Sequence, residues 1–338
     1  MNAVNQPKVS VIIPNYNHAP YLRQRIETVL RQTFQDFEVI LMDDCSTDES
    51  GSIISEYAND PRVRIELNEK NSGSTFRQWN KGVQLSRGKY IWLAESDDYS
   101  DERLLERLVP ALESEPAAKF AYCRSWCVDE EGRQRGFIDL GLSEAEPQRW
   151  AANYCSDGRD ECRNYFVVCN TVPNASAVLF RKTAYAEVGG ADESFRICGD
   201  WKLWAGMALK GKVVYVAQPL NYFRVHDDSV RSRDIGRGIV TQETLRVVRW
   251  ILGHVKVTDS TLARVREKVS ELWIPALITL RVPLGVKFTI LRNATAIEPW
   301  AFRRMIRPAF IGFGLKLQIL RRLSHERRLK KKIPANDH

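Results

Sequence analysis

The stretch Trp92-Leu93-Ala94-Glu95-Ser96-Asp97-Asp98-Tyr99 decides the fold, because an apolar, β-prone run ends there in three carboxylates within four positions. If residues 89–94 form a buried strand, these acids gather at its carboxyl end, where open parallel sheets bind their ligands. Like charges so close repel one another unless a cation joins them, and carboxylate oxygens suit Mg²⁺ or Mn²⁺. Aspartates also follow strands in ordinary solvated turns, so this octapeptide alone leaves both interpretations open.

Outward from this stretch, the first 115 residues alternate between predicted strands and predicted helices. The strands are 9–14, 37–42, 62–67 and 89–94, and the helices are 19–31, one starting at Asp48, 76–85 and one capped by Asp101. Such alternation indicates a parallel sheet with helices on its faces. Because parallel strands end at one edge, the tips at Asn15, Asp43-Asp44 and 95–97 should form a crevice. No glycine-rich phosphate loop follows the first strand, which argues against a dinucleotide-binding enzyme and a P-loop ATPase.

The pattern becomes mixed after residue 116. Predicted strands at 120–128, 135–140, 175–180, 213–216 and 220–225 flank a loop with short helices at 141–164 and a helix at 200–209. From residue 237 onward only helical patterns remain. A polar connector at 229–238 predicts a boundary before this helical part.

Composition narrows the class of protein. The 338 residues carry a net charge of +8, and the surplus cations lie mainly beyond Arg246. Seven irregularly spaced cysteines and the lack of a secretory leader or a membrane-spanning run predict a cytoplasmic protein with reduced thiols. In the basic tail after Ala301, apolar and basic residues interleave, which favours peripheral contact with an anionic membrane at the cytoplasmic face, or packing on the preceding domain. The tail lacks the interleaved aromatics of a nucleic-acid site, so no nucleic-acid partner is expected.

Two further residues are candidates for a catalytic or a ligand-binding role. Asp200 opens a predicted helix, where the dipole stabilises an anion, so it is a candidate general base or simply a helix cap. His226 follows a predicted strand just after Arg224, and it is a candidate metal or phosphate ligand or a structural histidine.

Several motifs together resemble the family 2 glycosyltransferases. They occur in the family's order and spacing over residues 8–229: Val9-Ser10-Val11-Ile12-Ile13-Pro14-Asn15-Tyr16-Asn17, Gln32-Thr33-Phe34-Gln35-Asp36-Phe37-Glu38-Val39-Ile40, Asp43-Asp44 with Ser46 and Asp48, Asn71-Ser72-Gly73, Asn80, Gly82 and Gly88-Lys89-Tyr90-Ile91.

This resemblance implies a GT-A fold, an α/β architecture with a Rossmann-like mixed sheet flanked by helices, and here a helical C-terminal extension. The catalytic domain would span 1–230, with a nucleotide-binding half at about 1–115 and an acceptor half at about 116–230, and the helical basic region would span 231–338. Family members transfer a sugar from a nucleoside diphosphate to an acceptor hydroxyl with inversion. We expect a UDP-sugar donor, a glycan or lipid-linked acceptor in cell-envelope polysaccharide synthesis, and Mg²⁺ or Mn²⁺ as cofactor.

The resemblance also implies roles for individual residues. Asp200 would be the catalytic base. Asp97 would bind the divalent metal that bridges the diphosphate, and His226 would contact the metal or the diphosphate. The donor would contact Pro14, Asn15, Tyr16, Asp43, Asp44, Ser74, Glu95, Ser96 and Asp98.

The sequence departs from the family's pattern at two positions. Glu95 replaces the first acid of the usual Asp-x-Asp motif, and Gly199 stands before the base where a glutamate is common. These departures leave open a non-catalytic sugar-nucleotide-binding or scaffold protein on the same fold. A metal-dependent nucleotidyltransferase is a second alternative, although residues 15–20 offer no cation for a triphosphate.

Overall fold

A mixed sheet of ten strands runs through the computed structural model, which describes residues 6–138, 146–226, 237–279 and 281–301. Its main path is β3 (Val63–Leu67), β2 (Phe37–Asp43), β1 (Val9–Asn15), β4 (Tyr90–Leu93), β9 (Val178–Arg181), β6 (Ala118–Val128), β10 (Lys212–Arg224) and β5 (Tyr99–Ser100). Two more strands pair off this path, β7 (Gln134–Phe137) with β6 and β8 (Tyr154–Asp157) with β10.

Strand directions bring the important tips to one edge. Strand β1 lies parallel to both β2 and β4, as the alternation of strands and helices predicts. Strand β9 runs antiparallel between β4 and β6, and β6 is parallel to β10. The carboxyl ends of β1, β2, β4 and β10 therefore share an edge. The strand order reverses between β1 and β4, which is where sheets of this kind bind ligands.

Helices cover both faces of the sheet, so its central strands are buried throughout. Alternate residues of β1 enter different cores because successive side chains point to opposite faces. Val11 and Ile13 pack with α1 (Ala19–Leu30), α2 (Ser50–Ser55) and α4 (Leu104–Glu113). Ile12 packs with α3 (Thr75–Leu85), α7 (Lys182–Glu187) and α8 (Gly199–Ala208).

Two glycines of the quoted motifs allow the backbone to approach β1 closely. A Cβ atom on Gly82 of α3 would lie 2.5 Å from the Ile12 Cγ2 atom. A Cβ atom on Gly88, just before β4, would lie 2.5 Å from the backbone nitrogen of Ser10. Larger residues at either position would push α3 or the start of β4 away from β1.

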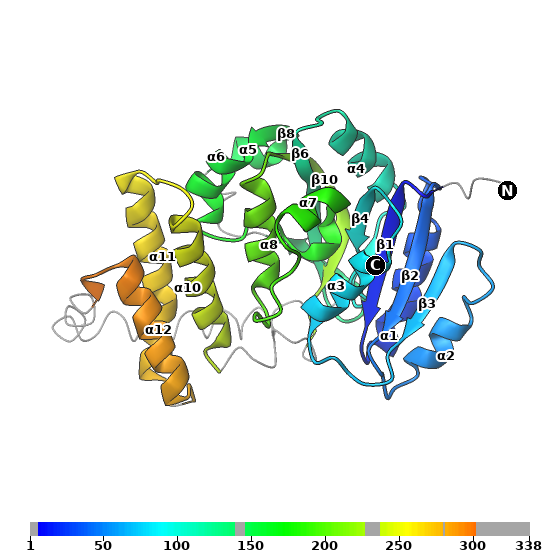
Figure 1. The fold of residues 1–338 in the computed structure, drawn as a ribbon, viewed down its shortest axis with the longest axis horizontal. Coiled ribbons are helices and arrows are strands. Elements are labelled where there is room, and N and C mark those ends of the chain that lie inside the picture. The colour runs from blue at the N-terminus through cyan, green and yellow to red at the C-terminus, as the bar shows by residue number, and fades with distance from the viewer. Residues whose placement is uncertain (1–5, 139–145, 227–236, 280, 302–338) are drawn as a thin grey trace, which may run out of the picture.

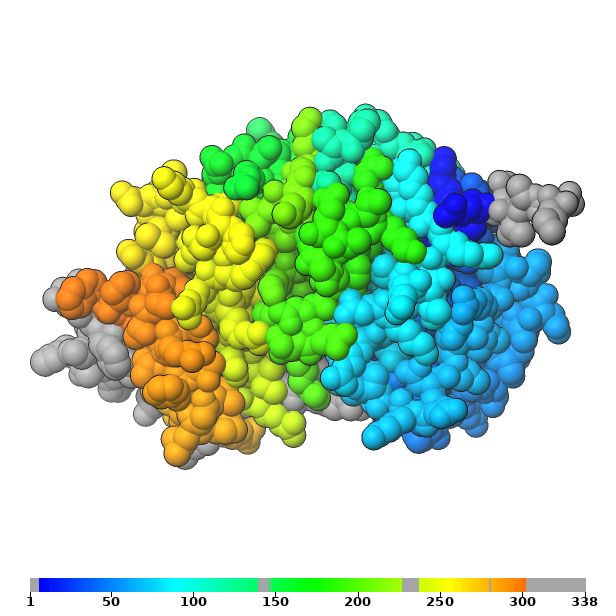
Figure 2. Space-filling view, in the orientation of Figure 1, coloured from blue at the N-terminus to red at the C-terminus, as the bar shows by residue number. Residues whose placement is uncertain are grey.

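Three helices, α10 (Ile239–Leu252), α11 (Asp259–Ile278) and α12 (Leu284–Ile297), follow the sheet domain and stand at the end of the molecule away from β2 and β3 (Figure 1). They share a core with it, because Leu245, Val248, Trp273 and Ile290 belong to the same buried cluster as α3 and α8. Figure 2 shows α10 and α11, in yellow, lying directly against the green segments. None of the described helices combines the length and apolarity needed to cross a bilayer. The predicted basic tail, residues 302–338, lies outside the described residues.

The structure corrects several predicted elements. The segment 141–164, predicted as a loop with short helices, does contain short helices in its described part, α5 (Pro147–Ala151), α6 (Gly158–Glu161) and the start of a π-helix (Cys162–Phe166), but it also contains strand β8, which was not predicted. The predicted strands 213–216 and 220–225 form one strand, β10, because bulges around Pro219 accommodate a residue without an N–H group. The segment predicted as a strand at 175–180 begins as a 3₁₀ turn (Ala175–Ala177). Asp101 does not cap α4, since its carboxylate accepts the Arg103 N–H instead.

Candidate active site

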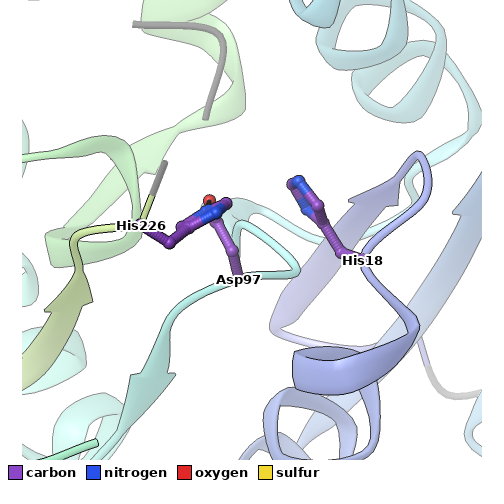
Figure 3. Close-up of side chains that lie close together, drawn as sticks. All are labelled: His18, Asp97 and His226. Carbon is purple, nitrogen blue, oxygen red and sulfur yellow. Dashed lines mark hydrogen bonds and ion pairs between the residues drawn. The ribbon is translucent and has the colours of Figure 1, made fainter. Parts of the chain in front are cut away.

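Two histidines and an aspartate meet at the carboxyl edge of the sheet. Asp97 follows β4, His226 follows β10 and His18 lies between β1 and α1. The Nε2 atom of His226 is 3.0 Å from the Asp97 Oδ2 atom, and one ligand atom from each of the three residues lies within 4.8 Å of the others. Figure 3 shows the two imidazoles reaching toward the Asp97 carboxylate from elements on either side of it. The sequence analysis paired Asp97 with His226, and it missed His18, although this imidazole stands only three residues beyond the strand tip at Asn15.

Arg224 holds the acidic loop in place from the end of β10. Its backbone N–H donates to the Asp98 carboxylate at 3.0 Å, and its Nε atom donates to the Asp97 carbonyl oxygen at 2.9 Å. The same guanidinium donates to the Glu130 carbonyl oxygen and lies 4.7 Å from the centroid of the Tyr21 ring. Arg224 thus links the backbone of the acidic loop to β10, to the turn at Glu130 and to α1. It lies two residues before His226.

A fully buried arginine compensates part of the acidic charge. Arg25 of α1 donates from Nε to the Glu95 carbonyl oxygen at 2.8 Å, and its Nη2 atom is 4.0 Å from the Asp98 carboxylate. Burial raises the pKa of Glu95 to about 8 and that of Asp98 to about 7, and the charge of Asp97 adds to both shifts. Burial also opposes ionisation of Asp97, but the hydrogen bond from His226 and the charge of His18 hold its pKa below the usual value. Asp97 is therefore the most acidic of the three carboxyl groups in this loop.

Glu95 and Asp98 face the protein interior in this structure. The Glu95 Oε1 atom accepts a hydrogen bond from the Trp79 indole at 2.7 Å, and Asp98 is 2% exposed. The longer side chain of Glu95, compared with aspartate, reaches α3 rather than the edge of the crevice. Asp97, with 20% of its side chain exposed, is the acid of the motif that opens toward a ligand.

The tip of β2 bears two buried carboxylates that bind the surrounding loops. Asp43 accepts hydrogen bonds from Asn15 Nδ2 at 2.8 Å and from the Ser46 backbone and hydroxyl at 2.8 and 2.6 Å. Asp44 accepts four, from Asn68, from the backbone and hydroxyl of Ser72, and from Gln78, and this fills the capacity of a carboxylate. Both acids brace the loops around the tip of β2, and the predicted base contact through Asp44 would need one of these bonds to be exchanged.

The other predicted donor residues lie along the same edge. Pro14 and Asn15 are buried at the end of β1, whereas Tyr16 is 40% exposed and available for stacking. Ser96 is hydrogen-bonded through its hydroxyl to His18 Nδ1 at 2.8 Å. Ser74 caps α3, since its hydroxyl accepts the Arg77 N–H.

Asp200 lies in the first turn of α8 and is half-buried. Its Oδ2 atom accepts a hydrogen bond from Asn170 Nδ2 at 3.1 Å. Helix α3 joins this turn to the acidic loop, because Phe76 stacks edge-on to Trp79, the residue that binds Glu95, and also fills the space beside Gly199. A Cβ atom on Gly199 would lie 2.5 Å from the Phe76 ring, which explains why no glutamate stands before Asp200.

Part of this sequence is similar to known proteins. Residues 10–166 match the family described as Glycosyl transferase family 2. Among curated proteins, glycosyltransferase GlyG of Streptococcus pneumoniae is 38% identical over 110 residues, which cover 32% of this chain and 36% of GlyG. The chain thus spans about a third of the length of that relative.

Solved structures share the fold. Staphylococcus aureus TarS (residues 1–349, in complex with UDP-GlcNAc) superposes with a TM-score of 0.64 at 16% identity, covering 87% of this chain and 82% of TarS. The mannosyltransferase PcManGT of Pyrobaculum calidifontis, in complex with GDP-Man and Mn²⁺, superposes with a TM-score of 0.57 at 14% identity, covering 91% and 81%. The architecture is therefore the GT-A fold, as the resemblance implied. The match over residues 10–166 agrees with the resemblance to the family 2 glycosyltransferases.

Proposed function

We propose that the chain transfers a sugar from a nucleoside diphosphate to an acceptor hydroxyl, with inversion, in cell-envelope polysaccharide synthesis. The observation that carries this proposal is the meeting of His18, Asp97 and His226 at the reversal point of the sheet in a chain whose residues 10–166 match this family. The complex of TarS with UDP-GlcNAc favours a UDP-sugar donor, and the free cysteines favour a cytoplasmic location. The acceptor would be a glycan or a lipid-linked glycan.

The same three residues fit a divalent cation. Two imidazole nitrogens and one carboxylate oxygen form a mixed donor set, which suits Mn²⁺ better than Mg²⁺, an ion that prefers oxygen ligands. Bound there, the cation would act as a Lewis acid that stabilises charge on the leaving diphosphate. His18, Asp97 and His226 would hold the cation, while Arg25 and Arg224 keep the acidic loop in position.

Asp200 is the proposed general base. It would accept the proton of the attacking hydroxyl, while Asn170 orients its carboxylate through the 3.1 Å hydrogen bond. Pro14, Asn15, Tyr16, Asp43 and Ser96 line the proposed nucleotide side of the crevice. We further propose that the transferase chemistry lies within residues 1–230, although helices α10 to α12 share a core with the sheet.

The proposal is tested by incubating the protein with a panel of nucleotide sugars and Mn²⁺ and measuring the nucleoside diphosphate released. We expect release from a UDP-sugar, with Asp200→Asn lowering the rate about 10²- to 10⁴-fold while donor binding by calorimetry is unchanged. Asp192→Asn is the matched control, because Asp192 lies in the segment that leads into α8 and forms an ion pair with Lys202.

Three results would contradict parts of this proposal. Full activity of Asp200→Asn would remove the base assignment. Donor binding without any turnover would favour the scaffold alternative, and release of pyrophosphate from a nucleoside triphosphate would favour a nucleotidyltransferase.

A further inference from the structure

Helix α12 exposes an apolar stripe to solvent. Leu284 and Phe288 are 84% and 69% exposed and stand four residues apart, so they share one side of the helix. Residues 290, 293, 294 and 297 are buried on the other side. Of the eight large apolar side chains that stand out as exposed in the described part of the chain, four lie between residues 278 and 300, with Ile278 at 61% and Trp300 at 65%. Exposed apolar side chains concentrated in this way mark an interaction surface.

The stripe continues into a basic cavity. Arg292, four residues beyond Phe288 and also exposed, lines a cavity of about 410 Å³ between α10 and α12. Arg246, Arg249 and His254 line it as well, and no carboxylate does. Arg249 donates to Asn293 at 3.3 Å, and Arg246 donates to Ser194. Across the described ranges, no ion pair neutralises any of these three arginines.

The charge of the α12 surface indicates which kind of partner can bind there. Helix α12 contains Lys287 and Arg292 and no acidic residue. A second copy of this face would bring two sets of arginines together. The chain's own residues 302–338 carry eleven Lys and Arg against two acids, so they also fail to complement it. A bilayer with anionic headgroups complements both parts, since its acyl boundary accepts leucine and phenylalanine and its phosphates accept arginine.

We propose that α12 docks on an anionic membrane surface, with Leu284 and Phe288 entering the headgroup boundary and Arg249 and Arg292 binding lipid phosphates. This contact is distinct from the one predicted for the basic tail, because it is formed by a folded helix packed on the sheet domain. It would set the orientation of the whole molecule on the bilayer, with β2 and β3 at the far end (Figure 1).

Co-sedimentation of the full chain with vesicles of phosphatidylcholine, with and without phosphatidylglycerol, tests the proposal. We expect binding that needs the anionic lipid, and a loss of at least tenfold in affinity for Leu284→Ser/Phe288→Ser and for Arg249→Gln/Arg292→Gln. Leu67→Ser and Arg64→Gln on β3 are matched controls, since Leu67 is 62% exposed and the Arg64 side chain is 50% exposed. Both controls should bind as the wild type does.

Wild-type binding by both double variants would overturn the proposal and leave the tail as the membrane contact. A concentration-dependent dimer in sedimentation velocity that Leu284→Ser/Phe288→Ser abolishes would also overturn it, since a second copy would then occupy this face. Circular dichroism and melting of each variant separate lost docking from lost folding, and these exposed positions should leave both unchanged.

Discussion

Single residues at the edge of the sheet determine which ion the proposed site would prefer. Without the histidines, Asp97 would offer a metal ion only carboxylate oxygens. The approach of His18 from β1 and His226 from β10 turns it into a site of two nitrogens and one oxygen. Since imidazole favours transition-metal ions, the donor set favours Mn²⁺ over Mg²⁺.

His18→Ala should weaken Mn²⁺ binding at least tenfold, because it removes one of the three proposed protein ligands. Electron paramagnetic resonance of free Mn²⁺ in a titration measures this directly, without any turnover. His254→Ala is the matched control, because His254 is an exposed histidine near the end of α10 whose Nδ1 atom lies 2.8 Å from the Trp250 carbonyl oxygen. Equal Mn²⁺ affinity in His18→Ala and wild type would exclude His18 as a ligand.

Among the helices, α10 makes a contact that bears on the proposed base. Glu243 of α10 is 4% exposed, and its carboxylate accepts the backbone N–H groups of Arg196, Ile197 and Cys198 at 2.7, 2.9 and 2.8 Å. These three residues directly precede Gly199 and Asp200. A carboxylate from the C-terminal helices therefore fixes the turn from which α8 starts.

Glu243→Gln should lower kcat for transfer about tenfold while the donor KM stays within about twofold, because the glutamine amide group cannot accept the N–H group that one carboxylate oxygen now accepts. The free energy of unfolding should fall by about 1–3 kcal/mol. Steady-state kinetics and urea unfolding measure the two effects. Glu267→Gln on the exposed side of α11 is the control, and a variant at 243 with unchanged kcat would show that the contact is only structural.

In the whole molecule, the sheet domain and the C-terminal helices behave as one packing unit. Leu245 of α10 is fully buried in the cluster that also contains Trp79, Trp204 and Ile12. The boundary predicted near residue 230 is thus crossed by a continuous core.

Leu245→Ala should destabilise the whole protein by about 2–5 kcal/mol, since it leaves a cavity inside this shared core. Scanning calorimetry should show one transition that moves to lower temperature as a whole. A pair of transitions, of which only one moves, would contradict the shared core and favour two independent units.

Apart from the two-residue strand β5, the sequence by itself determined the strands and helices of the first 115 residues to within a few positions, because alternating apolar patterns and strand-ending polar residues are local signals. It also predicted that Asn15, Asp43 and Asp97 lie at one edge of the sheet, since neighbouring parallel strands end at the same edge. Pairing over long distances had no such local signal. Strand β8 lies in a polar stretch, and it exists because β10 offers it an edge.

Only the tertiary structure decided what the side chains at that edge do. His18 joins Asp97 because β1 and β4 are neighbours, although 79 positions separate them in the chain. Glu95 turns toward Trp79, and Gly199 is required by the Phe76 ring, because α3 fills the space between the acidic loop and α8. Residue type and order fix which elements form, whereas packing between distant elements fixes which polar atoms remain free to bind a ligand.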